Sequence, residues 1–186
     1  MNIAVYCSSR SGLGECYENA AAALGKWIGS NGHSLVYGGS NAGTMHTLAQ
    51  AAHDAGAHIT GVVPECFALR ADPLVDTLIP TADLAERKGR MIALADLFVV
   101  LPGGIGTIDE WISTLTHLVV SGDRGTRIVV VNIGGVFNEM LAQIAATAAS
   151  PFARGGTPVD GHCVVAAGIE EMINQLNAIT NYDNEK

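Results

Sequence analysis

The stretch LFVVLPGGIGTIDE, residues 97–110, joins an apolar run to a glycine-rich turn and two carboxylates. The run LFVVL, residues 97–101, predicts a buried strand, and residues 111–120 are typical of a helix. A strand that enters a helix through a glycine turn directs unpaired backbone N–H groups outward, where the helix dipole adds partial positive charge. This stretch therefore predicts a phosphate-binding site.

The residues of the turn have separate expected roles. Gly103 and Gly104 can take positive φ and let the backbone approach a ligand closely, while Gly106 leaves the helix entrance open. Thr107 is a predicted N-cap, whose hydroxyl would accept from a backbone N–H of the first turn or bind a phosphate oxygen. Two interpretations of the carboxylates that follow stay open. They suit a helix N-terminus electrostatically, or one of them stabilises positive charge on a bound sugar.

Strands and helices alternate along the chain, which predicts an α/β fold. Expected strands cover residues 3–7, 34–37, 58–63, 97–101, 127–132 and 163–165, and expected helices cover residues 15–30, 44–55, 83–95, 111–120, 137–149 and 168–179. Prolines make 65–80 an expected irregular surface loop near the ligand. We therefore expect a single Rossmann-like domain over 1–180, with an open parallel sheet and helices on both faces, and a flexible tail over 181–186.

Three loops rich in small residues follow expected strands, at 8–12, 38–43 and 102–106. In an open parallel sheet such loops meet at one edge and enclose a ligand crevice. The first loop lacks the G-x-G-x-x-G order, and no acidic residue ends the second strand to bind a ribose. The sequence also lacks a G-x-x-x-x-G-K-[ST] loop. These patterns favour a mononucleotide as ligand.

Composition narrows the class of protein. The net charge of −8 over 186 residues argues against a general nucleic-acid or acidic-membrane binder. Four scattered cysteines predict free thiols in a reducing compartment. With no expected signal peptide or membrane span, we expect a cytoplasmic protein. The six histidines show no metal-ligand spacing, so we expect no metal and no cofactor.

A basic cluster precedes the central strand. Arg87 and Lys88 are adjacent, and Arg90 follows within one helical turn. Arg87 could bind a phosphate or carboxylate through two hydrogen bonds. The alternative is a solvated helix face on which Asp83 and Glu86 neutralise the cluster. Position alone favours the solvated face.

Five motifs occur in one order along the chain. They are Cys7-Ser8-Ser9, Val36-Tyr37-Gly38-Gly39, Gly61-Val62-Val63-Pro64, Glu86-Arg87-Lys88 with Met91, and Pro102-Gly103-Gly104-x-Gly106-Thr107-x-x-Glu110. From about residue 3 to residue 177 the sequence thereby resembles the LONELY GUY family. These are cytokinin riboside 5′-monophosphate phosphoribohydrolases, often labelled lysine decarboxylases.

The resemblance implies hydrolysis of the N-glycosidic bond of an adenosine-type 5′-monophosphate, which yields the free base and ribose 5-phosphate. It implies that Arg87 and Glu110 are catalytic. The substrate-binding residues that it implies are Ser9, Gly39, Lys88, Gly103, Gly104, Ile105, Gly106, Thr107, Asp109 and Thr116. It also implies a homodimer, or a larger assembly of dimers, with sites near the subunit interface.

The chain departs from the family pattern around the expected base pocket. The departures are Ser8, Ser40, His46, Ser113 and His117, and the loop 65–72 lacks the family's acidic residue. An alternative function is therefore a non-catalytic nucleotide or molybdenum-cofactor carrier on the same fold. Pyridoxal-phosphate decarboxylation is disfavoured, because neither Lys26 nor Lys88 has the surroundings that a Schiff-base lysine requires.

Overall fold

The computed structural model of this chain describes residues 1–123, 125, 127–151 and 159–184. Within them, seven strands form one parallel sheet in the order β4-β3-β2-β1-β5-β6-β7. The strands are β1 (Asn2–Tyr6), β2 (Ser34–Tyr37), β3 (Ile59–Pro64), β4 (Thr77–Thr81), β5 (Leu97–Val100), β6 (Ile128–Val131) and β7 (Cys163–Ala166). The α-helices are α1 (Glu15–Ser30), α2 (Gly43–Asp54), α3 (Leu84–Leu94), α4 (Ile105–Ser121), α5 (Asn138–Ala148) and α6 (Ile169–Asn184).

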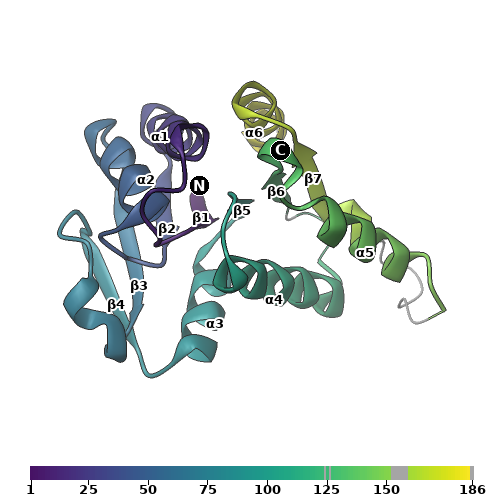
Figure 1. Cartoon of the computed structure of the whole chain (residues 1–186), viewed down its shortest axis with the longest axis horizontal. Coiled ribbons are helices and arrows are strands. Elements are labelled where there is room, and N and C mark those ends of the chain that lie inside the picture. The colour runs from purple at the N-terminus through teal and green to yellow at the C-terminus, as the bar shows by residue number, and fades with distance from the viewer. Residues whose placement is uncertain (124, 126, 152–158, 185–186) are drawn as a thin grey trace.

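The helices cover both faces of the sheet, with α1, α2 and α6 on one face and α3, α4 and α5 on the other (Figure 1). Successive side chains of β1 alternate between these layers. Ile3 and Val5 pack in the core beneath α1, α2 and α6, whereas Ala4 and Tyr6 pack against the helices of the opposite face. Because both faces are buried, the strands need continuous apolar runs. The predicted parallel α/β architecture is confirmed.

Strand order reverses at β1, which positions the ligand crevice. β1 pairs with β2 on one side and with β5 on the other, in a register that sets Val5 opposite Tyr37 and Tyr6 opposite Val100. The loops that follow β1, β2 and β5 therefore emerge at the same edge of the sheet. This is the topological switch point at which open α/β sheets bind ligands.

The expectation of an irregular loop over 65–80 is wrong. Residues Glu65–Arg70 form a 3₁₀ helix, η1, and β4 pairs in parallel with β3 over Thr77–Thr81. Pro80 lies inside this strand because β4 is at the edge of the sheet. An edge strand tolerates proline, since one side of its backbone has no ladder partner.

Two helix boundaries also differ from the expectation. α4 begins at Ile105 instead of residue 111, so the glycine turn already contains its first turn. α6 continues to Asn184, because no glycine or proline interrupts the chain there, and the expected tail is helical up to that residue. Residues 185–186 lie outside the described part of the chain.

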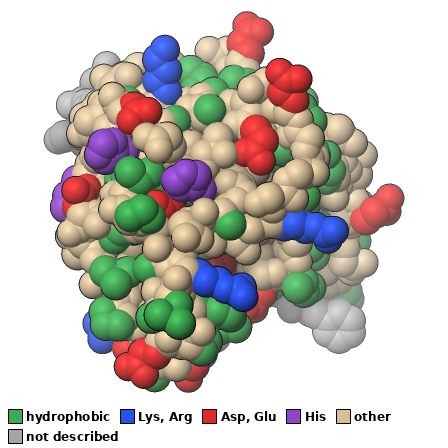
Figure 2. Space-filling view, turned by 60° about the vertical axis from the view of Figure 1, so that its left-hand side comes forward, with side chains coloured by type: hydrophobic (Ala, Val, Ile, Leu, Met, Phe, Trp, Pro, Cys, Tyr) green, Lys and Arg blue, Asp and Glu red, His purple; other side chains and the backbone are tan. Residues whose placement is uncertain are grey.

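The surface is acidic overall, in keeping with the net charge of −8. On the face shown in Figure 2, lysine and arginine side chains stand singly among acidic and uncharged ones. None of the described helices is both long and apolar enough to cross a membrane. Any anion that binds must therefore be held by local geometry and a few placed cations.

Candidate active site

The first turn of α4 lies at the switch point with its backbone N–H groups exposed. Gly104 is the N-cap residue, and Ile105 and Gly106 are exposed at the first helical positions. The expectation that Thr107 is the N-cap is wrong, because it is the third residue of the helix and buried. Its hydroxyl donates to the Cys7 carbonyl at the end of β1, at 3.0 Å. This bond connects the helix to the end of the first strand. At the predicted phosphate-binding site, the Thr107 hydroxyl is therefore already paired, and the backbone N–H groups are the donors that remain.

Gly103 is required by this arrangement. A Cβ at this position would overlap the side chain of Thr107, well inside van der Waals distance. A Cβ on the neighbouring Gly104 would meet no atom within 4 Å. Only the first of these two glycines is therefore enforced by packing.

Arg87 of α3 and Glu110 of α4 form an ion pair under the sheet edge. One terminal nitrogen of Arg87, Nη2, donates to Oε1 of Glu110. The side chains are 13% and 3% exposed, so the pair is largely shielded from water. Nε of Arg87 is buried and has no hydrogen-bond partner among the described residues. Burial of a donor without a partner is costly, and it makes this part of Arg87 a strained feature of the site.

Glu110 is held in an environment that favours its protonated form. Burial raises the pKa of this carboxyl from 4.5 to about 7, although the charges of Arg87 and Lys88 oppose the shift. A carboxyl with such a pKa changes ionisation near neutral pH, which suits a group that stabilises charge or transfers a proton.

A polar contact from β1 supports the backbone of Glu110. The hydroxyls of Tyr6 and Thr114 are 2.7 Å apart, and the Thr114 hydroxyl donates to the Glu110 carbonyl at 2.9 Å. Burial raises the pKa of Tyr6 well above its usual value, so its hydroxyl keeps its proton. The carboxylate therefore projects from a helix turn that is fixed against the centre of the sheet.

The three residues of the basic cluster differ in how exposed their side chains are. Nζ of Lys88 lies 2.7 Å and 2.8 Å from the two carboxylate oxygens of Asp109. Arg90 is 60% exposed and contacts Glu86 at 3.3 Å within the same helix. The solvated-face interpretation therefore describes Arg90 but not Arg87, which the structure directs inward to Glu110.

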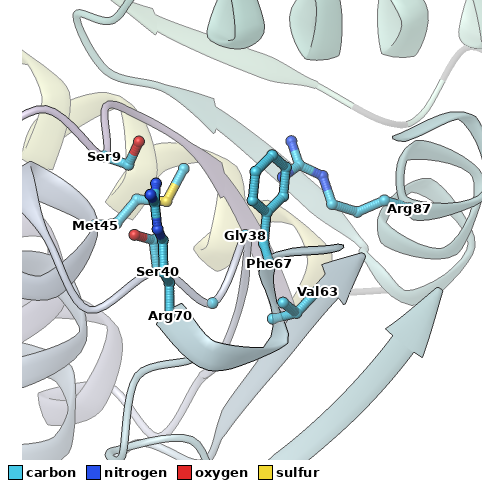
Figure 3. A pocket seen from close by; sticks show the side chains of 9 residues that line it. Ser9, Gly38, Ser40, Met45, Val63, Phe67, Arg70 and Arg87 are labelled. Atoms are coloured by element: carbon cyan, nitrogen blue, oxygen red, sulfur yellow. The ribbon is translucent and has the colours of Figure 1, made fainter. Parts of the chain in front are cut away.

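A small cavity of about 120 Å³ opens beside Arg87 (Figure 3). It is lined by Ser9, Gly38, Gly39, Ser40, Met45, Val63, Phe67, Arg70 and Arg87. Whole-ligand pockets usually measure roughly 300–1,000 Å³, so this one fits part of a nucleotide.

A second cavity, of about 360 Å³, lies on the other side of the β1–α1 loop. It is lined by Ser8, Arg10, Leu13, Tyr17, Pro102, Gly103, Gly104 and Val136. Ser8 lines this cavity and its neighbour Ser9 lines the first, so both flank the same loop. One cavity thus lies at the glycine turn and the other beside Arg87.

The structure places five of the predicted site residues in the walls of these two cavities. Ser9, Gly39 and Arg87 line the first, and Gly103 and Gly104 line the second. Thr116 lies elsewhere in the single chain. It lines a groove of about 500 Å³ between α3 and α4, together with Lys88, Ser113 and His117.

Sequence reasoning missed several lining residues, among them Phe67, Arg70 and Arg10. Phe67 and Arg70 come from η1, which has no helical or strand period in sequence, and Arg10 comes from the first small-residue loop. The signal that could have found the arginines is their scarcity, since the chain has only ten lysines and arginines.

One of the departures from the family pattern makes a specific contact. Nδ1 of His46 lies 2.8 Å from Oδ2 of Asp72, whose side chain is fully buried. The other oxygen of Asp72 accepts from the backbone N–H of Leu74 at 3.1 Å. His46 thus attaches α2 to the segment after η1. Among the described residues, no three His, Cys, Asp or Glu side chains are grouped so that they could hold a metal ion.

Comparisons with known proteins agree with the motifs. A family model described as "Possible lysine decarboxylase" matches residues 45–175. Cytokinin riboside 5′-monophosphate phosphoribohydrolase LOG5 of Arabidopsis thaliana is 31% identical over 179 residues, which cover 95% of this chain and 77% of that protein. LOG7 of the same plant, which has the same enzyme name, is 32% identical over 177 residues, with coverages of 94% and 80%. The chain belongs to the LONELY GUY family.

Solved structures show the LONELY GUY fold in proteins with other names. The molybdenum cofactor binding protein of Rippkaea orientalis matches with a TM-score of 0.75, at 20% identity, over 96% of each chain. A likeness at this identity shows the fold alone. The family assignment confirms the resemblance drawn from the sequence motifs.

Proposed function

We propose that this protein hydrolyses the N-glycosidic bond of a nucleoside 5′-monophosphate and releases the free base and ribose 5-phosphate. AMP and its N6-substituted relatives are the substrates that the family resemblance implies. The observation that carries the proposal is the buried pair of Arg87 and Glu110 beside the first turn of α4. We assign the reaction to the cytoplasm, since all four cysteines are free thiols.

In this reaction, the bond between C1′ and the base nitrogen breaks and positive charge develops on the ribose. The ionised carboxylate of Glu110 stabilises this charge in a site that excludes most water. Water then adds its oxygen to C1′, and the departing base takes up a proton. Arg87 holds the carboxylate in place.

The 5′-phosphate would bind at the glycine turn. Exposed N–H groups at the start of α4 supply hydrogen bonds, and the helix dipole supplies partial positive charge. Arg10 lines the same cavity as Gly103 and Gly104 and adds a full positive charge. The base would then lie in the smaller cavity beyond Ser9, with the ribose between them.

We further propose that the protein acts as a homodimer through the groove between α3 and α4. Leu84 is 49% exposed on α3 and Val120 is 61% exposed on α4, and both would lose water contact against a second copy. Thr116 lines this groove, away from both cavities of its own chain. A second copy seated there would bring Thr116 towards the partner's site, which supports its expected role in substrate binding.

The test is incubation of the purified chain with AMP, without added metal, and measurement of free adenine and ribose 5-phosphate by chromatography. We expect release by the wild type and a loss of roughly 100-fold or more in Glu110→Gln, because the stabilising charge is removed. Arg87→Met should lose activity to a similar degree. Lys26→Gln, which changes an exposed lysine of α1, should remain active.

Two results would overturn the proposal. One is a folded wild type that releases base from no common nucleoside monophosphate. The other is a Glu110→Gln variant that remains fully active. A carrier function would appear instead as a nucleotide or molybdenum cofactor that is retained intact in the purified protein at a fixed ratio to the chain.

A further inference from the structure

Arg70 is an unpaired cation in the wall of the small cavity. It is the last residue of η1 and lines the same cavity as Arg87, which enters from α3 (Figure 3). Whereas Arg87 is paired with Glu110, the side chain of Arg70 makes no hydrogen bond or ion pair with any residue that the structure describes. Its guanidinium donors are therefore free for a ligand.

The backbone around Arg70 is fixed to the second glycine turn. The carbonyl of Arg70 accepts from the N–H of Asn41 at 3.1 Å, and the N–H of Asp72 donates to the carbonyl of Gly39 at 2.8 Å. The contact between Asp72 and His46 anchors the same segment to α2. The backbone of Arg70 is consequently fixed at the cavity wall. Only the outer part of its side chain needs to become ordered when a ligand binds.

The polar side chains of this cavity are two arginines, which only donate hydrogen bonds, and two serines, which donate and accept them. Arg70 and Arg87 supply guanidinium groups, and Ser9 and Ser40 supply hydroxyls. Met45 and Phe67 provide apolar surface suited to a planar ring. Among the described residues that line the cavity there is no Asp, Glu, Asn or Gln side chain.

Purine bases differ in what they offer to such a lining. A 6-oxopurine presents two acceptors, O6 and N7, which an arginine can bind together. Adenine presents the N7 acceptor beside an N6 amino donor. Asparagine or glutamine can bind both groups, but a guanidinium group has only donors and therefore cannot pair with the amino group. An amino group facing Arg70 would lose its contact with water without gaining an acceptor from the guanidinium group.

We infer that Arg70 selects 6-oxopurine nucleoside 5′-monophosphates over adenosine-type ones, with the base edge that carries O6 and N7 facing its guanidinium group. The inference rests on the proposed hydrolysis and names the base for that site. It extends the substrate class beyond the one that the family resemblance implies. Phe67 and Met45 would hold the ring, and Arg87 with Glu110 would act on the sugar end.

The experiment compares IMP with AMP, because their bases differ at position 6 while the sugar phosphate is the same. Release of hypoxanthine or adenine gives kcat/KM for each nucleotide. We expect the wild type to prefer IMP by about tenfold, within the range for one bidentate base contact. In Arg70→Gln, the amide can pair with adenine, so the ratio should fall to one or below.

Lys26→Gln is the matched control, since it removes a cation from the exposed face of α1 and should keep the wild-type ratio. The ratio is measured within one protein sample, so partial misfolding of a variant does not alter it. A wild type that cleaves AMP as well as IMP would overturn the inference. So would a preference for IMP that persists in Arg70→Gln.

A binding measurement distinguishes failure of the proposed hydrolysis from failure of the inference about Arg70. If neither nucleotide is cleaved, the Kd values of IMP and AMP are measured by calorimetry on the wild type and on Arg70→Gln. About tenfold tighter binding of IMP that disappears in the variant would sustain the base preference of Arg70 in a binding protein. Equal Kd values for the two nucleotides in the wild type would overturn it.

Discussion

Ionisation of Glu110 should lower the stability of the fold. Its side chain is 3% exposed, and burial raises its pKa from 4.5 to about 7. The folded chain therefore keeps this proton between about pH 4.5 and pH 7, where the unfolded chain has lost it. The free energy of unfolding must fall as pH rises through that window, and the loss is complete above it. The shift corresponds to roughly 3 kcal/mol in total.

Urea unfolding of the wild type and Glu110→Gln at pH 5 and pH 8 measures this effect. Glutamine does not ionise, and the other titrating groups are common to both proteins, so their contributions largely cancel in the difference. Relative to the variant, the wild type should lose about 2–3 kcal/mol between the two pH values. A wild type that gains stability instead would show that the ion pair with Arg87 outweighs burial, and the reasoning would be refuted.

The same ionisation should act on catalysis in the opposite direction. Only the charged carboxylate of Glu110 stabilises positive charge on the ribose. We therefore expect kcat/KM to rise with pH through about 7, following the pKa of Glu110. A rate that is constant or that falls between pH 5.5 and pH 8.5 would contradict this role.

Two further predictions test how the start of α4 is built. Gly103→Ala should weaken nucleotide binding, seen as a raised KM, because its Cβ would displace the side chain of Thr107. Thr107→Val should lower the free energy of unfolding by about 1–3 kcal/mol, because it leaves the buried Cys7 carbonyl without this donor. In the same urea experiment the exposed Thr116→Val should change stability by less than about 0.5 kcal/mol, and equal losses in both variants would contradict the assignment.

Local sequence signals were sufficient to predict helix ends that are capped by nearby side chains. Asp83 and Glu86 have the spacing of a capping box, and the structure confirms it. Oδ1 of Asp83 accepts from the N–H groups of Ala85 and Glu86, and Oε2 of Glu86 accepts from the N–H of Ala82. Such contacts span only a few residues, so the sequence contains all that is needed to predict them.

Elements that depend on distant parts of the chain were predicted less well. Pro80 was read as a strand breaker, but its tolerance comes from the edge position of β4, which only the strand order reveals. Thr107 was read as a cap, because Gly104 and Gly106, on either side of Ile105, hid where the helix begins.

The candidate site shows the same division. The glycine turn is contiguous, so its place at the start of a helix could be predicted from the sequence. Arg87 and Glu110 lie 23 residues apart and meet only because α3 and α4 pack on the same face of the sheet. The family resemblance, rather than spacing, named them together. Arg70 was missed because its role depends on how η1 is attached to the glycine turn after β2.

The proposed base contact and the proposed catalytic pair belong to separate parts of the chain. Phe67 and Arg70 lie in the segment 65–72 between two strands at one border of the sheet, whereas Arg87 and Glu110 lie on α3 and α4. That segment is fastened chiefly by main-chain hydrogen bonds, which do not depend on side-chain identity. Substitutions at its other positions, away from the contact between Asp72 and His46, should therefore leave the backbone of the segment in place. Substitutions within these eight residues could therefore change which base is preferred, while the proposed catalytic residues on α3 and α4 stay the same.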